Sequence, residues 1–131
     1  MARRRGLGLT VMLLVFAAWN SAAMEQTAPD PEALVGIWQV DLRPNPEAEP
    51  YYQDFVIESI EENSIRGHFY GTPIENGQIN TTWGKVHFAF TTSDGSGTYH
   101  TSGVLEDSGL QGTTHSLGRG FLAVWTAEPK E

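Results

Sequence analysis

The chain has 131 residues, a size typical of one globular domain, and 40% of them are hydrophobic. It contains no cysteine, which excludes disulfides, thiolate zinc sites, iron–sulfur clusters and thiol nucleophiles. Its 8 basic and 16 acidic residues give a formal charge of −8, which argues against nucleic-acid binding because a phosphate backbone needs a cationic surface.

The first 23 residues have the pattern of a secretory signal peptide. Three arginines at 3–5 precede a 13-residue apolar run over 7–19, and small residues follow at 21–23. A retained membrane anchor is the alternative, but it would need roughly 20 apolar residues to span a bilayer. We therefore expect cleavage after Ala23 and an exported protein, periplasmic or secreted, that does not act at a membrane.

Cleavage would make the protein more acidic. It removes three basic residues and no acidic one, which leaves 5 basic against 16 acidic side chains. Such a surface favours solubility and disfavours anionic membranes, although it would also attract a cationic partner.

The rest of the chain predicts a flexible lead-in at 24–30 and one domain at 31–131. Asp30 followed by Pro31 is a helix-start signal, and only one turn fits before Gly36. Beyond Gly36, short runs rich in β-branched and aromatic residues alternate with turn residues, and no helical periodicity persists. We predict strands over 36–42, 52–60, 64–72, 78–83, 85–92, 98–106, 109–117 and 120–127.

The turns between these runs are short, so they can join only antiparallel neighbours. An open sheet would leave two long edges, whereas closure into a barrel removes both. We therefore predict an all-β, antiparallel up-and-down meander closed into a barrel of about eight strands, with a two-sheet sandwich as the alternative. A barrel of about eight strands has an interior just wide enough for side chains or one small ligand.

The motif Leu34-Val35-Gly36-Ile37-Trp38 places a Gly-x-Trp after a capped turn and ahead of the meander. This arrangement resembles the opening of the calycin barrels, the lipocalins and avidins. The resemblance implies that Gly36 lets the chain turn tightly into the barrel and that Trp38 plugs its closed end. If the barrel closes, the first strand adjoins the last, which carries Trp125.

Two later motifs also resemble calycin features. Arg119, in Leu117-Gly118-Arg119-Gly120, is similar to a late lipocalin arginine that stacks on the first-strand tryptophan, which implies contact with Trp38. A solvated arginine in a turn is the alternative. Ile79-Asn80-Thr81-Thr82-Trp83 is similar to a late avidin strand that lines the biotin pocket, but here it lies in the middle of the chain.

Hairpin geometry predicts a pair of histidines. If Asp107-Ser108 forms a two-residue turn, His100 lies opposite His115 and Ser102 lies opposite Thr113. These four residues would then share one face of the sheet, because side chains alternate between the two faces of a strand.

The neighbouring hairpins decide which face that is. Centring the loop at 93–97 places Phe90 beside His100, and centring the last loop places Leu122 beside His115. An apolar wall with a few polar groups is typical of a small-ligand pocket, and tyrosine and tryptophan side chains would complete its walls. The predicted ligand-binding residues are His100, His115, Ser102, Thr113, Tyr70, Trp83 and Tyr99.

No catalytic, metal or cofactor site is predicted. Two histidines need a third ligand to make a catalytic zinc site, and no Gly-x-Ser-x-Gly elbow is present. We expect an exported protein that binds a small, partly apolar molecule. The alternatives are a module that presents loops such as 44–51 or 93–97 to an exported protein partner, and an enzyme that uses the histidine pair for proton transfer in the cavity.

Overall fold

The chain enters the barrel through a single helical turn. The computed structural model describes residues 28–131, so the predicted signal peptide and most of the lead-in lie outside the described residues. The 3-10 helix η1 (Pro31–Leu34) is capped by Asp30, whose carboxylate accepts a hydrogen bond from the backbone N–H of Glu32, as predicted. Within 28–131, no helix is long and apolar enough to cross a bilayer.

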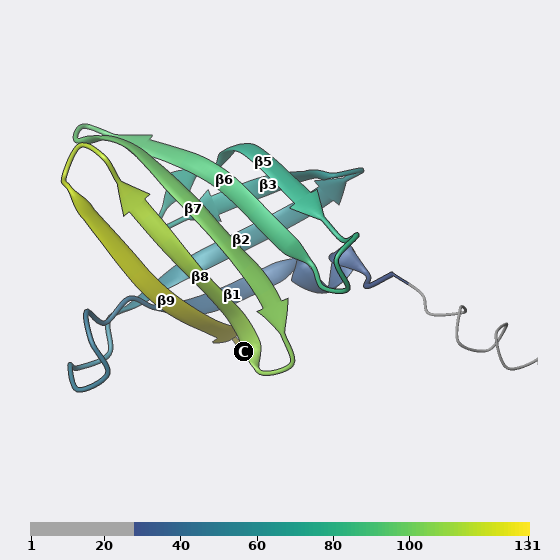
Figure 1. The fold of residues 1–131 in the computed structure, drawn as a ribbon, viewed down its shortest axis with the longest axis horizontal. Helices are drawn as coiled ribbons and strands as arrows, with labels where there is room; N and C mark the ends of the chain where they lie inside the picture. Colours follow the sequence, from purple (N-terminus) through teal and green to yellow (C-terminus); the bar gives the residue numbers. More distant parts are fainter. Residues whose placement is uncertain (1–27) are drawn as a thin grey trace, which may run out of the picture.

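Nine antiparallel strands follow η1 and curl into a nearly closed barrel (Figure 1). They are β1 (Gly36–Asp41), β2 (Tyr52–Glu61), β3 (Ser64–Phe69), β4 (Thr72–Pro73), β5 (Glu75–Asn80), β6 (His87–Asp94), β7 (Gly97–Glu106), β8 (Gly109–Ser116) and β9 (Phe121–Pro129). Their order in the sheet is β4-β3-β2-β1-β9-β8-β7-β6-β5. The predicted all-β meander is confirmed, with nine strands instead of eight.

The first and last strands lie side by side, as a closed meander requires. β1 pairs with β9 from Trp38 opposite Pro129 to Asp41 opposite Thr126. The remaining seam lies between β3 and β5, where the backbone N–H of Ile79 donates to the carbonyl of Asn63 at 2.8 Å. The barrel is therefore closed along β1 and β9 and nearly closed at this seam.

Two predicted strands differ from the observed ones by more than two residues at an end, whereas the other six agree within two residues. The run predicted at 64–72 is divided into β3 and β4 by a tight turn in which Tyr70 and Gly71 adopt φ values of 56° and 77°. The run predicted at 78–83 becomes β5, which begins at Glu75 and ends at Asn80. Trp83 consequently lies in the loop before β6.

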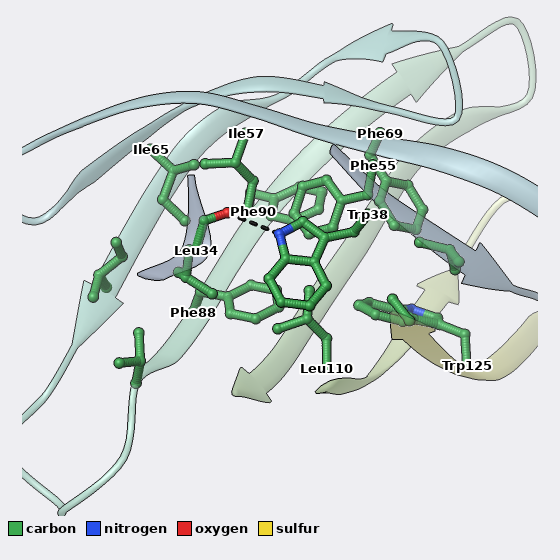
Figure 2. Packing of buried hydrophobic residues seen from close by; sticks show 14 residues of the cluster. Leu34, Trp38, Phe55, Ile57, Ile65, Phe69, Phe88, Phe90, Leu110 and Trp125 are labelled. Carbon is green, nitrogen blue, oxygen red and sulfur yellow. Dashed lines mark hydrogen bonds between the residues drawn. The ribbon is translucent and has the colours of Figure 1, made fainter. Parts of the chain in front are cut away.

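Aromatic side chains fill the middle of the barrel (Figure 2). Phe55 is fully buried, and its ring centroid lies between 5.2 and 6.3 Å from those of Phe69, Phe88, Phe90 and Trp125. Such edge-on and tilted contacts are the favoured arrangements of aromatic rings. They leave this part of the interior solid.

One end of the barrel is closed by Trp38 and η1. The indole N–H of Trp38 donates to the carbonyl of Leu34 at 2.8 Å, and both side chains are buried (Figure 2). Gly36, which joins η1 to β1, has a φ of 141°, a value that glycine adopts far more readily than other residues. The end of the barrel near η1 is therefore filled by side chains.

Candidate functional site

The end of the barrel opposite η1 contains an open cavity of about 350 Å³, which we call the cup. Residues from the β1–β2 loop, the β3–β4 turn, the β6–β7 hairpin and the β8–β9 loop line it. Figure 1 shows the β6–β7 and β8–β9 turns together at this end of the barrel. The lining of the cup includes aromatic side chains, threonines, one acidic residue and one basic residue, with a few small or aliphatic side chains between them.

Aromatic side chains form the walls of the cup. Tyr51 and Tyr70 meet edge to face, with ring centroids 6.1 Å apart, and their hydroxyl groups are hydrogen-bonded to each other. On the opposing strands, the centroids of Tyr99 and Phe121 lie 6.4 Å apart. These rings provide apolar surface with polar edges at the mouth.

Tyr70 adopts a backbone conformation that is rare for an aromatic residue. It occupies the first position of the two-residue β3–β4 turn, which requires a left-handed φ. Its backbone N–H donates to the carbonyl of Asp54 at 3.1 Å, which holds the turn in place. Such strain costs on the order of 1–3 kcal/mol and is found most often at binding and active sites.

One negative and one positive side chain lie at the mouth. Asp94 accepts hydrogen bonds of 2.8 Å from the backbone N–H of Ser96 and from the hydroxyl of Tyr99. These two bonds lower the pKa of Asp94, and the bond from Ser96 has the larger effect. Asp94 is therefore ionised at neutral pH. The guanidinium of Arg119 lies 4.9 Å from the centre of the Phe121 ring, a cation–π contact.

Threonine hydroxyls form the floor. Thr114 lines the cup, and its hydroxyl lies 2.9 Å from that of Thr101 and accepts a hydrogen bond from the indole N–H of Trp125 at 3.1 Å. Thr92 also lines the cup and is only 5% exposed. Within residues 28–131 its hydroxyl makes no hydrogen bond, so a buried threonine lines the cavity with a hydroxyl that has no partner there.

The structure brings some of the predicted site residues to this cup. Tyr70 and Tyr99 line it, and so does Arg119, which was predicted to stack on Trp38. That stacking prediction is wrong, because Arg119 follows β8 at the open end and lies over Phe121, whereas Trp38 plugs the other end. Trp83 lies away from the cup in the β5–β6 loop and is 82% exposed.

The predicted polar residues His100, Ser102, Thr113 and His115 do pair as expected across β7 and β8. They lie on the outer face of the barrel, however, where both imidazoles are exposed and line only a shallow groove. The expectation that they face the interior is therefore corrected. For the same reason, the histidine pair does not supply proton transfer inside the cavity.

A one-residue shift in the β6–β7 register explains this difference. His100 lies opposite Thr91, not Phe90, because Asp94 pairs with Gly97 and leaves only two residues in the turn. The Asp94 side chain tightens this turn through its bond to the Ser96 N–H. An odd shift moves a strand's side chains to the other face, so Phe90 points inward and His100 outward.

Sequence reasoning missed the cavity roles of Thr92, Thr114, Phe121 and Asp94. The alternation of side chains between the two faces of a strand locates the two threonines. Thr92 lies two residues from the buried Phe90, and Thr114 lies on the same face as the buried Leu110. A correct β6–β7 turn would have placed both threonines inside.

The described residues contain no cluster of three or more histidine, aspartate or glutamate side chains able to hold a metal ion. Comparison of the chain with protein-family models, with curated proteins and with solved structures finds no match. The chemistry of the cup is thus the guide to function.

Proposed function

We propose that this protein binds a small, partly apolar molecule in the cup. The observation that carries this proposal is an open cavity of about 350 Å³ with aromatic walls and a few polar groups. Small-molecule sites typically have volumes of about 300–1,000 Å³ and this kind of lining. Because aromatic side chains fill the middle of the barrel, a ligand would enter only from the open end.

A calycin-like identity is part of the same proposal. It is supported by the one-turn helix before β1, by Gly36 and Trp38 at the closed end, and by the pairing of β1 with β9. The proposal also includes export, which rests on the signal-peptide pattern at 1–23. An exported barrel with one open end would bind its ligand outside the cytoplasm.

A pair of adjacent substitutions tests the proposed site. Ala123 lines the cup, whereas Val124, the next residue of β9, is 67% exposed on the outer face. With N-phenyl-1-naphthylamine as a fluorescent probe, we expect saturable one-to-one binding to the wild type and to Val124→Trp. Ala123→Trp should abolish it by filling the cavity. Equal binding by both variants, or no binding by the wild type, would contradict the proposal.

A second candidate function is protein interaction, favoured by large apolar side chains that remain exposed. Leu122 and Val124 lie two residues apart on the outer face of β9 and are 61% and 67% exposed. Exposed apolar surface of this kind occurs at protein interfaces. If this surface binds an exported partner, protein isolated from its own host carries a second chain, and Leu122→Glu releases it. Isolation without a second chain would argue against this function.

A further inference from the structure

The floor of the cup has a defined hydrogen-bonding direction. The hydroxyl oxygens of Thr101 and Thr114 lie 2.9 Å apart, so one of them donates to the other. Thr114 also accepts a hydrogen bond from the indole N–H of Trp125 at 3.1 Å. The indole N–H can only donate, so this second bond occupies one acceptor position of Thr114.

Burial determines which threonine donates. Thr101 is only 2% exposed, and Thr114 is its one side-chain hydrogen-bond partner within 28–131. If Thr114 donated, the Thr101 proton would be buried without an acceptor, which is costly. Thr101 therefore donates to Thr114. The Thr114 oxygen then accepts two bonds, the capacity of a hydroxyl.

The cup side of Thr114 is thus a donor only. Its lone pairs are engaged by Thr101 and Trp125, while its own proton remains free where the side chain lines the cavity. Thr92 supplies a second buried hydroxyl without a partner in the described part of the chain. A ligand group that reaches this floor must accept a hydrogen bond from Thr114. It can also accept a second hydrogen bond from Thr92.

We propose that the ligand enters the cup with an uncharged hydrogen-bond acceptor leading, a carbonyl oxygen on a flat apolar body. This inference rests on the proposed function and names the chemical class of its ligand. A carbonyl oxygen has two lone pairs and so accepts from both threonines, and a flat body fits between the aromatic walls. A charged leading group would lose its hydration, since the charged groups of the cup, Asp94 and Arg119, lie at the exposed mouth.

Two probes of nearly the same shape test this class. They are 2-acetylnaphthalene, which has the carbonyl oxygen, and 2-isopropenylnaphthalene, in which a methylene group replaces that oxygen. The dissociation constant of each is measured for the wild type and for each variant, and the ratio of the two constants is compared. The ratio cancels differences in how strongly water solvates the two probes, because these do not change between variants.

The variants remove one floor hydroxyl at a time. Thr92→Val breaks no hydrogen bond of the described residues, whereas Thr114→Val also removes the acceptor of both Thr101 and Trp125. Thr114→Ser keeps the hydroxyl, and Thr113→Val makes the same exchange as Thr114→Val one residue away on the outer face. Thermal unfolding of each variant checks that the barrel is intact.

We expect Thr92→Val and Thr114→Val each to weaken the ketone about fivefold relative to the alkene, the size of one lost hydrogen bond. Thr114→Ser and Thr113→Val should leave the ratio unchanged. If both probes bind the wild type but neither valine variant in the floor changes the ratio, this inference is overturned while the proposed function stands. If neither probe binds the wild type, the inference and the proposed apolar site are both overturned.

Discussion

Gly103 and Gly112 lie opposite each other on β7 and β8 and leave room for two aromatic rings. A Cβ atom on Gly103 would lie 2.6 Å from the Phe88 ring, and one on Gly112 would overlap the ring of Trp125. At this pair, the absence of side chains allows the aromatic core to pack directly against the sheet. Close packing against these rings is the role that the structure assigns to both glycines.

Substitution of Gly112 by alanine should therefore destabilise the barrel. We expect a loss of about 1–3 kcal/mol in the free energy of unfolding, because the added methyl group must displace Trp125 or the backbone carbonyl of Ser102. Gly95→Ala is the matched control, since a Cβ there meets no atom within 4 Å. Urea unfolding measures both, and a Gly112→Ala variant as stable as the control would contradict this account of packing.

Asp94 makes stability depend on pH. Because hydrogen bonds from Ser96 and Tyr99 lower the pKa of Asp94 in the folded state, the ionised carboxylate stabilises the fold above the unfolded pKa, about 4. This contribution is lost as the pH falls through the lower, folded pKa. Asp94→Asn should therefore cost most stability near pH 7, and its difference from the wild type should shrink below pH ~4. Urea unfolding at a series of pH values tests this, and a difference independent of pH would refute it.

Strand β9 closes the meander by pairing with β1. Its C-terminal half pairs with β1, and beyond it the backbone N–H of Lys130 donates to the carbonyl of Ile37 at 2.8 Å. The Lys130 ammonium also lies 2.9 Å from the carboxylate of Asp54, but both side chains are nearly half exposed. An exposed ion pair contributes little, so the backbone ladder is the main link.

Deletion of residues 128–131 should open this closure. It removes the partners of Trp38 and Gln39 on β9 and exposes the closed end, so we expect a loss of at least ~2 kcal/mol in stability. Lys130→Gln, which removes only the ion pair, should cost less than ~1 kcal/mol. Denaturant unfolding compares the two, and equal stabilities would show that β9 closure is not what holds the barrel.

Most strands were predictable from the sequence because most hairpins have a clear turn and β-rich flanks. The β3–β4 turn was not predicted, because an aromatic residue, Tyr70, occupies its left-handed first position. The registers around Asp107-Ser108 and between His115 and Leu122 were also predicted correctly. The β6–β7 register was not, since its turn length depends on a side-chain bond from Asp94 that composition does not reveal. This one-residue difference in register led to the wrong face for the histidines, and so most of the candidate site was not predicted.

For the whole molecule, the interior is divided along the barrel axis. The end near η1 and the middle are filled by Trp38 and the phenylalanine cluster, and the opposite end is hollow. Within the part of the chain that the structure describes, the interior cavity therefore lies at the end where four connections between strands meet. We propose that a ligand lies there, against the threonine floor.

Nuclear Overhauser contacts between bound 2-acetylnaphthalene and the isotope-labelled protein test this placement of the ligand. We predict contacts from the probe's acetyl methyl group to the Thr92 and Thr114 methyl groups, and from its ring protons to Tyr99 and Phe121. Contacts instead to His100, His115 or Leu122 on the outer face would contradict the account.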